Sequence, residues 1–141
     1  MNLNLKATFA LLLALSAASI GVWAEFWPQE FFRSFPVSGH SWVSGLGPYN
    51  EHLVRDFGGL YLAMAVATSC AIKANSPEAF RSVGAAWLTF VVLHLVFHLH
   101  HLDVFTTPDV VGNVVVLGGQ LLLALALLVP SRTAHHVAVA P

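Results

Sequence analysis

The sequence predicts an all-α integral membrane protein: a bundle of four transmembrane helices, formed by residues 1–141 as a single membrane domain. Hydrophobic residues make up 57% of the chain and charged residues only 9%, whereas soluble domains carry about 25% charged residues. The chain contains four apolar segments close to the roughly 20 helical residues that cross a bilayer core. No segment shows the alternating ten-residue pattern of a membrane β-barrel. Lipid is therefore the expected solvent.

The first helix is expected at about residues 7–24. This stretch also resembles a secretory signal, because Lys6 precedes an apolar run that ends in small residues before Glu25. Its length suffices to cross a membrane. We therefore expect a retained helix, with cleavage of residues 1–24 as the alternative.

The other three helices are expected at about residues 50–73, 77–101 and 108–129. The sequence SPE at positions 76–78 offers a helix cap, a proline in the first turn and an acid near the positive end of the helix dipole. The sequence TPD at 107–109 repeats this pattern before the fourth helix, and Pro130 ends that helix. Pro48 and Asn50 precede the second.

The connection between the first and second helices, residues 25–49, is long and rich in Trp, Phe, Pro and Gly. Long connections are usually functional or disordered, and this one is too aromatic for disorder. We expect an ordered outer loop in the lipid headgroup zone. Trp23, Trp27, Trp42 and Trp87 are interpreted as interface anchors, with Trp87 marking the cytoplasmic side.

Small residues suggest where helices pack closely. Gly58-Gly59 and Gly118-Gly119 are predicted sites of close helix approach. The single cysteine, Cys70, excludes an internal disulfide or a CxxC motif, and it is interpreted as a small core residue.

The distribution of Lys and Arg predicts the orientation in the membrane. Four of the six lie at the N-terminus, between the second and third helices, and at the C-terminus, which share one side of a four-span protein; Arg33 and Arg55 lie on the other. The positive-inside rule then places both termini in the cytoplasm. The tail after Pro130, with His135 and His136, is expected to be a loose cytoplasmic end.

The third apolar segment ends in HLVFHLHHLD, residues 94–103. His94, His98 and His101 have i, i+4, i+7 spacing and form one stripe on a helix, whereas His100 points elsewhere. His94 should lie about 10 Å deeper than His101. An ionisable residue at that depth normally faces a bundle interior or cavity.

The second helix offers a matching pair, His52 and Asp56, one turn apart. Because this helix runs antiparallel to the third, the pair should reach the level of His98 and His101 if the two faces meet. Three further residues near the outer side are weaker candidates: Glu30, His40 and Glu51.

The fourth helix contributes Asn113 and Gln120, seven residues apart and therefore on one stripe. The polar residues of the second, third and fourth helices would then lie together in the interior of the bundle, in a region open to the outer side of the membrane. In membrane bundles such amides more often form hydrogen bonds between helices than bind ligands.

Imidazole and carboxylate groups together suit a transition metal (Cu, Zn or Fe) or haem. The predicted ligands are His52, Asp56, His94, His98 and His101. A metalloprotease is not indicated, because the helix lacks the glutamate of HExxH. A proton relay and a purely structural polar network remain alternatives.

The leading hypothesis is a metal- or haem-binding subunit of a redox or metal-handling membrane complex. The alternative is a non-catalytic accessory subunit whose polar residues hold helices together. With 141 residues there is little room for a catalytic domain, which favours a subunit over an independent enzyme. Expected partners are the bilayer and other membrane subunits or further copies of the chain. The net charge of −1 argues against nucleic acid.

The stretch RDFGGLYLAMAV, residues 55–66, resembles the entry of the second helix in DoxX-like small bacterial membrane proteins. In that family a charged residue precedes Gly-Gly, a hydrophobic residue and Tyr-Leu, and the length and four-helix layout are similar. The resemblance implies a four-helix bundle in a bacterial inner membrane. The histidine-rich third helix is not a feature of that resemblance.

Overall fold

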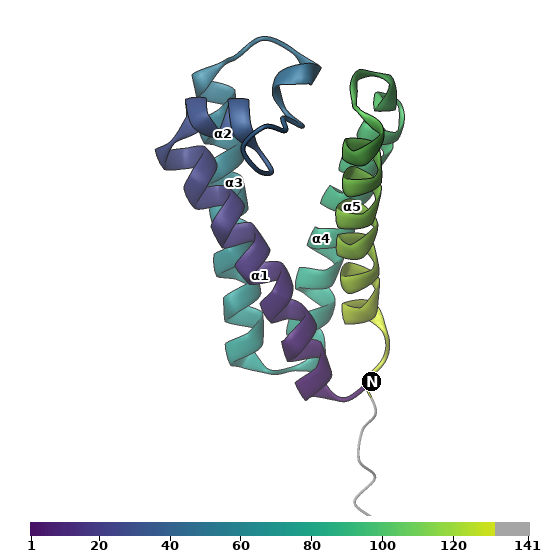
Figure 1. The fold of residues 1–141 in the computed structure, drawn as a ribbon. Coiled ribbons are helices and arrows are strands. Elements are labelled where there is room, and N and C mark those ends of the chain that lie inside the picture. The colour runs from purple at the N-terminus through teal and green to yellow at the C-terminus, as the bar shows by residue number, and fades with distance from the viewer. Residues whose placement is uncertain (132–141) are drawn as a thin grey trace, which may run out of the picture.

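The computed structural model of the protein describes residues 1–131, which fold entirely as helices and connections (Figure 1). Four helices are long: α1 (Leu3–Phe26), α3 (Glu51–Ala74), α4 (Pro77–Leu99) and α5 (Thr107–Leu128). Three are short: α2 (Pro28–Ser34), η1 (Ser44–Leu46) and η2 (Leu102–Val104). The predicted tail with His135 and His136 lies outside the described residues.

The four long helices are each long and apolar enough to cross a membrane. The protein is therefore an integral membrane protein whose environment is the lipid bilayer, and the predicted four-helix bundle is confirmed. The expected helix boundaries agree with the structure within a few residues. One difference matters for the site: α4 ends at Leu99, two residues before the predicted end.

The helix ends follow the sequence signals closely. The side chains of Asn50 and Ser76 accept hydrogen bonds from backbone N–H groups in the first turns of α3 and α4. Asn75 ends α3 in the left-handed conformation, with φ of 45°, which asparagine tolerates better than most residues. The capping residue of α5 is Thr106, whereas the TPD pattern predicted Thr107.

The helices associate as two pairs, α1 with α3 and α4 with α5 (Figure 1). The pairs meet at the end of the molecule that holds the N-terminus. They spread apart toward the opposite end, which holds the α1–α3 and α4–α5 connections. At the closed end the buried Lys6 Nζ donates to the carbonyl of Leu127 at 2.8 Å. The amino group of Met1 donates to the carbonyl of Pro130 at 2.8 Å. These contacts link the start of α1 to the end of α5.

Glycine permits the close approach of α1 and α3. A Cβ atom on Gly58 would lie 2.6 Å from the backbone nitrogen of Glu25. A Cβ on Gly21, opposite on α1, would lie 2.9 Å from the carbonyl oxygen of Gly58. The prediction for Gly58 is therefore confirmed.

The predictions for the other three glycines are wrong. A Cβ on Gly59 would have only a distant neighbour, and Gly118 and Gly119 have open space around them. Close packing between α4 and α5 instead uses Gly84, where a Cβ would lie 2.8 Å from the Cβ of Leu127. The pairing of the helices, which the sequence does not reveal, decides which glycine faces a neighbour.

Two other residues differ from their sequence interpretation. Trp87 is only 1% exposed, and its indole N–H donates to the hydroxyl of Thr68 at 2.9 Å between α4 and α3. It is a core residue and not an interface anchor, because Thr68 supplies the polar partner that an anchor finds in headgroups. Cys70, predicted in the core, is exposed on α3.

The connection between α1 and α3 is built around aromatic rings, as predicted. Phe31 of α2 is buried, with ring centroids 5.8 Å from Trp23, 4.8 Å from Phe35 and 5.8 Å from Phe57. Trp42 is also buried and meets Phe35 edge-on at 5.9 Å, so like Trp87 it is a packed residue and not the interface anchor that the sequence suggested. This aromatic loop covers the end of the molecule where the helix pairs are apart.

Candidate functional site: a pocket beneath the aromatic loop

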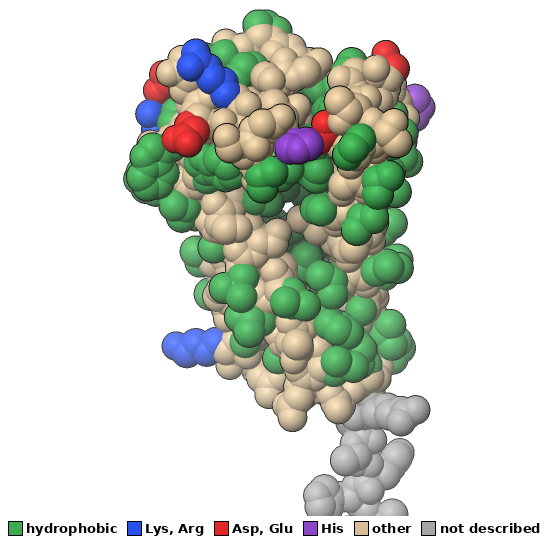
Figure 2. Space-filling model, viewed as in Figure 1, with side chains coloured by type: hydrophobic (Ala, Val, Ile, Leu, Met, Phe, Trp, Pro, Cys, Tyr) green, Lys and Arg blue, Asp and Glu red, His purple; other side chains and the backbone are tan. Residues whose placement is uncertain are grey.

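A pocket of about 390 Å³ lies between the two helix pairs, beneath the aromatic loop. In Figure 2 the molecule is hollowed between its two halves below the loop end, where the charged side chains gather. Most of the pocket lining is apolar, and seven Phe, Tyr and Trp rings contribute to it: Phe31, Phe32, Phe35, Trp42, Phe57, Tyr61 and Phe97. No Asp, Glu, Lys or Arg side chain lines the pocket. Its size and lining are typical of small-molecule sites.

The wall formed by α4 and α5 is polar. His98, Asn113 and Gln120 line the pocket and are 7%, 1% and 6% exposed. Three of their polar atoms are buried without a hydrogen-bond partner in the described part of the chain: His98 Nδ1, Asn113 Oδ1 and Gln120 Oε1. The predicted interior stripe of Asn113 and Gln120 is therefore present, and His98 joins it from the neighbouring helix.

The amide nitrogens of this wall are already engaged. Asn113 Nδ2 donates to the carbonyl of Asp109 at 3.0 Å, and Gln120 Nε2 donates to the hydroxyl of Ser16 at 3.3 Å. A buried polar group without a partner costs about 1–3 kcal/mol, and native proteins contain few of them. Three such atoms on one pocket indicate that a ligand or water supplies their hydrogen bonds.

The histidine stripe is only partly preserved. The rings of His94 and His98 lie 4.6 Å apart edge to face, and both residues line the pocket. His101 instead stacks on Phe97 at 4.2 Å, and its Nδ1 donates to the Phe97 carbonyl at 2.7 Å. Because α4 ends at Leu99, His101 does not continue the helical stripe, and it is not among the lining residues.

The predicted pair on α3 lies elsewhere. The side chains of His52 and Asp56 are 82% and 56% exposed, and they pair with one another at 3.4 Å. The expectation that all five predicted ligands surround one point is therefore not met. Within residues 1–131 no three His, Cys, Asp or Glu side chains are placed to hold one metal ion. Metal binding remains a hypothesis, now limited to His94 and His98.

The weaker candidates Glu30 and Glu51 also lie outside the pocket. Glu51 accepts a hydrogen bond from Arg55 Nε at 2.9 Å, the one-turn ion pair that the spacing predicts. Arg55 also donates to the backbone carbonyl of Glu25, and so connects α3 to the end of α1. These contacts support a structural role at the end of the first helix pair that holds the aromatic loop.

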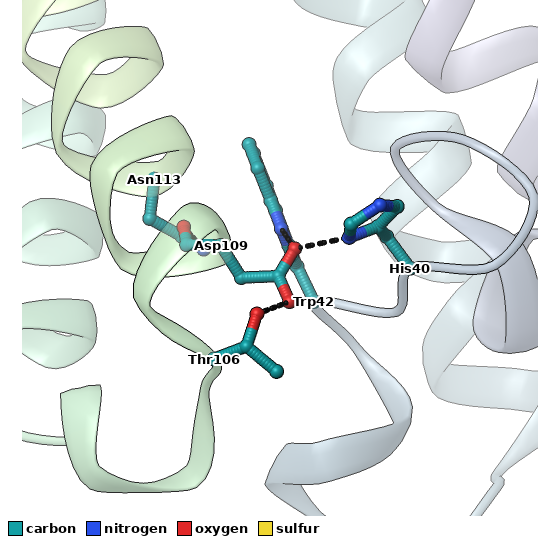
Figure 3. A network of polar contacts seen from close by, with 5 residues as sticks. All are labelled: His40, Trp42, Thr106, Asp109 and Asn113. Carbon is teal, nitrogen blue, oxygen red and sulfur yellow. Dashed lines mark hydrogen bonds and ion pairs between the residues drawn. The ribbon is translucent and has the colours of Figure 1, made fainter.

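Asp109, at the start of α5, connects the aromatic loop to the second helix pair (Figure 3). One of its carboxylate oxygens accepts from Trp42 Nε1 at 3.0 Å and pairs with His40 Nδ1 at 2.7 Å. The other accepts from the hydroxyl of Thr106 at 2.6 Å. The Trp42 ring lies against the α5 backbone, since a Cβ on Gly112 would come within 2.6 Å of it.

We call this set of contacts, made by His40, Trp42, Thr106 and Asp109, the loop latch. It bridges the gap between the two helix pairs at the end that holds the aromatic loop, near the pocket. The sequence interpretation gave Asp109 only the role of a first-turn acid. His40 was a candidate, but nothing in the sequence links it to a residue 69 positions away.

No protein-family model matches the chain, and no curated protein or solved structure shows significant similarity to it. The resemblance of residues 55–66 to DoxX-like proteins therefore remains a hypothesis.

Proposed function

We propose that the protein is a membrane-embedded binding protein whose pocket beneath the aromatic loop takes a neutral amphipathic small molecule. The polar group of the ligand would lie against His98, Asn113 and Gln120. Its apolar part would lie against the aromatic rings of the loop and of α3 and α4.

One observation carries this proposal: of the four buried side-chain polar atoms without a partner in residues 1–131, three belong to residues that line the same pocket, and the fourth is Ser131 Oγ. If such atoms were scattered through the bundle, they would not indicate a binding site. Gathered on one wall opposite aromatic rings, they form the pattern of a ligand site, in which a few polar groups orient a largely apolar molecule.

The lining also supports a neutral ligand. Burying an ion without a countercharge costs several kcal/mol or more, and no lining side chain is an acid, a lysine or an arginine. The acids and bases of the outer end instead pair with one another, as in the contacts of Arg55 with Glu51 and of His40 with Asp109.

The test uses 1-naphthol, a neutral aromatic probe, with the full-length protein in lipid nanodiscs. Binding is measured by equilibrium dialysis as the excess over empty nanodiscs. We expect saturable binding of one probe per protein. Val116→Trp should abolish this binding, because Val116 lines the pocket and an indole there would occupy its space.

Val115→Trp is the matched control, because Val115 is the adjacent residue on α5, is exposed and does not line the pocket. This variant should bind the probe like the natural protein. The absence of saturable binding, or equal binding by both variants when both elute as folded protein, would refute the proposal.

A second candidate is binding of a transition metal (Cu, Zn or Fe) or of haem. It is supported by the proximity of the His94 and His98 rings, 4.6 Å apart and one turn apart on α4, a spacing used for two ligands of one ion. Elemental analysis and absorption spectra test it. Metal or a Soret band lost in His98→Ala but retained in His52→Ala would support it, and metal-free protein after expression with added metal would contradict it.

We also propose that the protein lies in a bacterial inner membrane with both termini in the cytoplasm. The four spans put the N-terminus and the α3–α4 connection on one side, and Lys6, Lys73 and Arg81 lie toward that side. The excess of basic residues there supports a cytoplasmic location. If no ligand binds, the remaining candidate is a structural accessory subunit of a larger membrane complex.

A further inference from the structure

The direction of the hydrogen bonds on the polar wall identifies the kind of group that the pocket takes. Asn113 could in principle present either end of its amide to the pocket. Its Nδ2 donates to the backbone carbonyl of Asp109 at 3.0 Å. Rotating the amide by half a turn would set two oxygen acceptors against each other at that distance. The Asp109 carbonyl therefore fixes Asn113 with its oxygen free for the pocket.

Gln120 lies about two turns further along α5. Its Nε2 donates to Ser16 of α1, and its Oε1 is buried without a partner. The Ser16 hydroxyl can donate as well as accept, so Asn113 is the residue whose amide orientation a backbone carbonyl fixes. With the amides as the structure has them, the polar wall holds two carbonyl oxygens without a partner, and a carbonyl oxygen only accepts hydrogen bonds. His98 and Tyr61, which both line the pocket, adapt to either role, because a neutral imidazole has one donor and one acceptor nitrogen and a hydroxyl both donates and accepts.

We infer that the pocket selects molecules whose polar group donates hydrogen bonds: a neutral alcohol, a phenol or an amine in its uncharged form. Carbonyl compounds and ethers of the same shape, which only accept, are rejected. This inference rests on the proposed function, and it adds the substrate class to it.

The physical reason for rejection is the unpaired acceptor. A ligand without a donor would displace water from the two amide oxygens and leave them buried with no partner. Sites built to pair with a ligand OH or NH discriminate strongly against analogues that lack it. The apolar part of the pocket cannot provide this discrimination, because it contacts both kinds of ligand equally.

The test compares three probes with one ring system: 1-naphthol, 1-naphthylamine and 1-methoxynaphthalene. The first two carry a donor, and the third carries the same oxygen without its hydrogen. Each is measured by the nanodisc dialysis described above, with empty nanodiscs correcting for partition into lipid. We expect both donors to bind at least about tenfold more tightly than the methyl ether.

Two variants connect this preference to the wall. Asn113→Leu and Gln120→Met remove the acceptors, and each should reduce the preference for 1-naphthol over the methyl ether severalfold while retaining binding of the ether. Gln120→Met provides the test if Asn113→Leu fails to fold, because Asn113 also contacts the Asp109 carbonyl.

The possible failures are distinguishable. Saturable binding of all three probes with equal affinity would overturn the donor preference and leave the proposed function standing. A preference that persists unchanged in Gln120→Met and Asn113→Leu would also overturn it, since the wall would not be its source. If none of the probes binds saturably, both the proposed function and the inference fail.

Discussion

At the scale of single residues, Asp109 shows how one side chain connects distant parts of the chain. Its carboxylate receives the indole N–H of Trp42, the hydroxyl of Thr106 and the ring of His40. Two of these partners come from the aromatic loop, and Thr106 precedes α5. A carboxylate suits this position because its two oxygens accept several hydrogen bonds at once.

We predict that Asp109→Ala opens the loop latch. Without the carboxylate, Trp42 and His40 lose their partner on α5, and the loop has less to hold it over the pocket. The expected result is a lower unfolding temperature in detergent and greater quenching of tryptophan fluorescence by acrylamide.

Asp103→Ala is the control for this change. Asp103 is an exposed acid in η2, on the same connection between α4 and α5. Removing it also changes the net charge by one, without touching the latch. If both variants have the same unfolding temperature and quenching, the latch does not hold the loop.

His98 is another case in which the residue could be predicted but its role could not. Its position on a helical stripe with His94 is evident from the spacing, and both rings do line the pocket. The sequence suggested His101 and the α3 pair as its partners. In the structure it shares the pocket lining with Asn113 and Gln120 of α5, and α4 packs more extensively with α5 than with α3.

At the scale of the helices, Gly58 determines how closely α1 and α3 approach. The backbone of Glu25 would lie 2.6 Å from a Cβ at this position. Backbone cannot move aside as the end of a flexible side chain can. The two helices must therefore separate to accommodate any larger residue.

We predict that Gly58→Ala destabilises the protein by about 1–3 kcal/mol, the usual cost of overpacking. Unfolding in mixed micelles of increasing SDS content measures the free energy. Gly119→Ala, on α5, is the matched control, because a Cβ there meets nothing within 4 Å. It should leave stability unchanged or slightly raised, since alanine favours helix. Equal destabilisation by both changes would contradict the close approach at Gly58.

The end of α4, only two residues earlier than predicted, changes the composition of the site. The helix stops at Leu99, and His101 then precedes η2 with its ring against Phe97. A helix continued by two residues would have kept His101 on the stripe with His94 and His98. Helix boundaries are therefore as important for a site prediction as the spacing within the helix.

At the scale of the whole molecule, the two helix pairs share one core toward the end that holds the N-terminus and are bridged again by the loop latch at the other end. Lys6 and the amino group of Met1 bind carbonyls at the end of α5 on one side, and the loop latch closes the other. The pocket lies near the latch. This arrangement leaves space in a bundle whose helices otherwise pack closely within each pair.

We predict that the aromatic loop faces the outside of the cell. In a Cys70→Ser background, Ser38→Cys places a single thiol in the loop, and Glu78→Cys places one at the start of α4; both positions are exposed. A membrane-impermeant maleimide should label Ser38→Cys in intact cells, and Glu78→Cys only after permeabilisation. The opposite pattern would place the termini outside and contradict the orientation inferred from Lys and Arg.

The sequence by itself determined the four spans, nearly all of their boundaries and the polar residues of the interior. These follow from local properties: apolar length, capping residues and helical spacing act within a few turns of one helix. His94, His98, Asn113 and Gln120 were correctly expected to face the interior, because polar side chains at that depth avoid lipid, whereas His52 and His101 were not.

Only the tertiary structure decided which polar residues meet. Helix faces combine according to the pairing of helices, and that pairing depends on where small residues such as Gly58 and Gly84 permit contact. In the structure His52 and Asp56 are exposed, His98 lines one pocket with Asn113 and Gln120, and Asp109 binds Trp42. Such contacts depend on the sum of packing over whole helices, and no short segment of sequence encodes that sum.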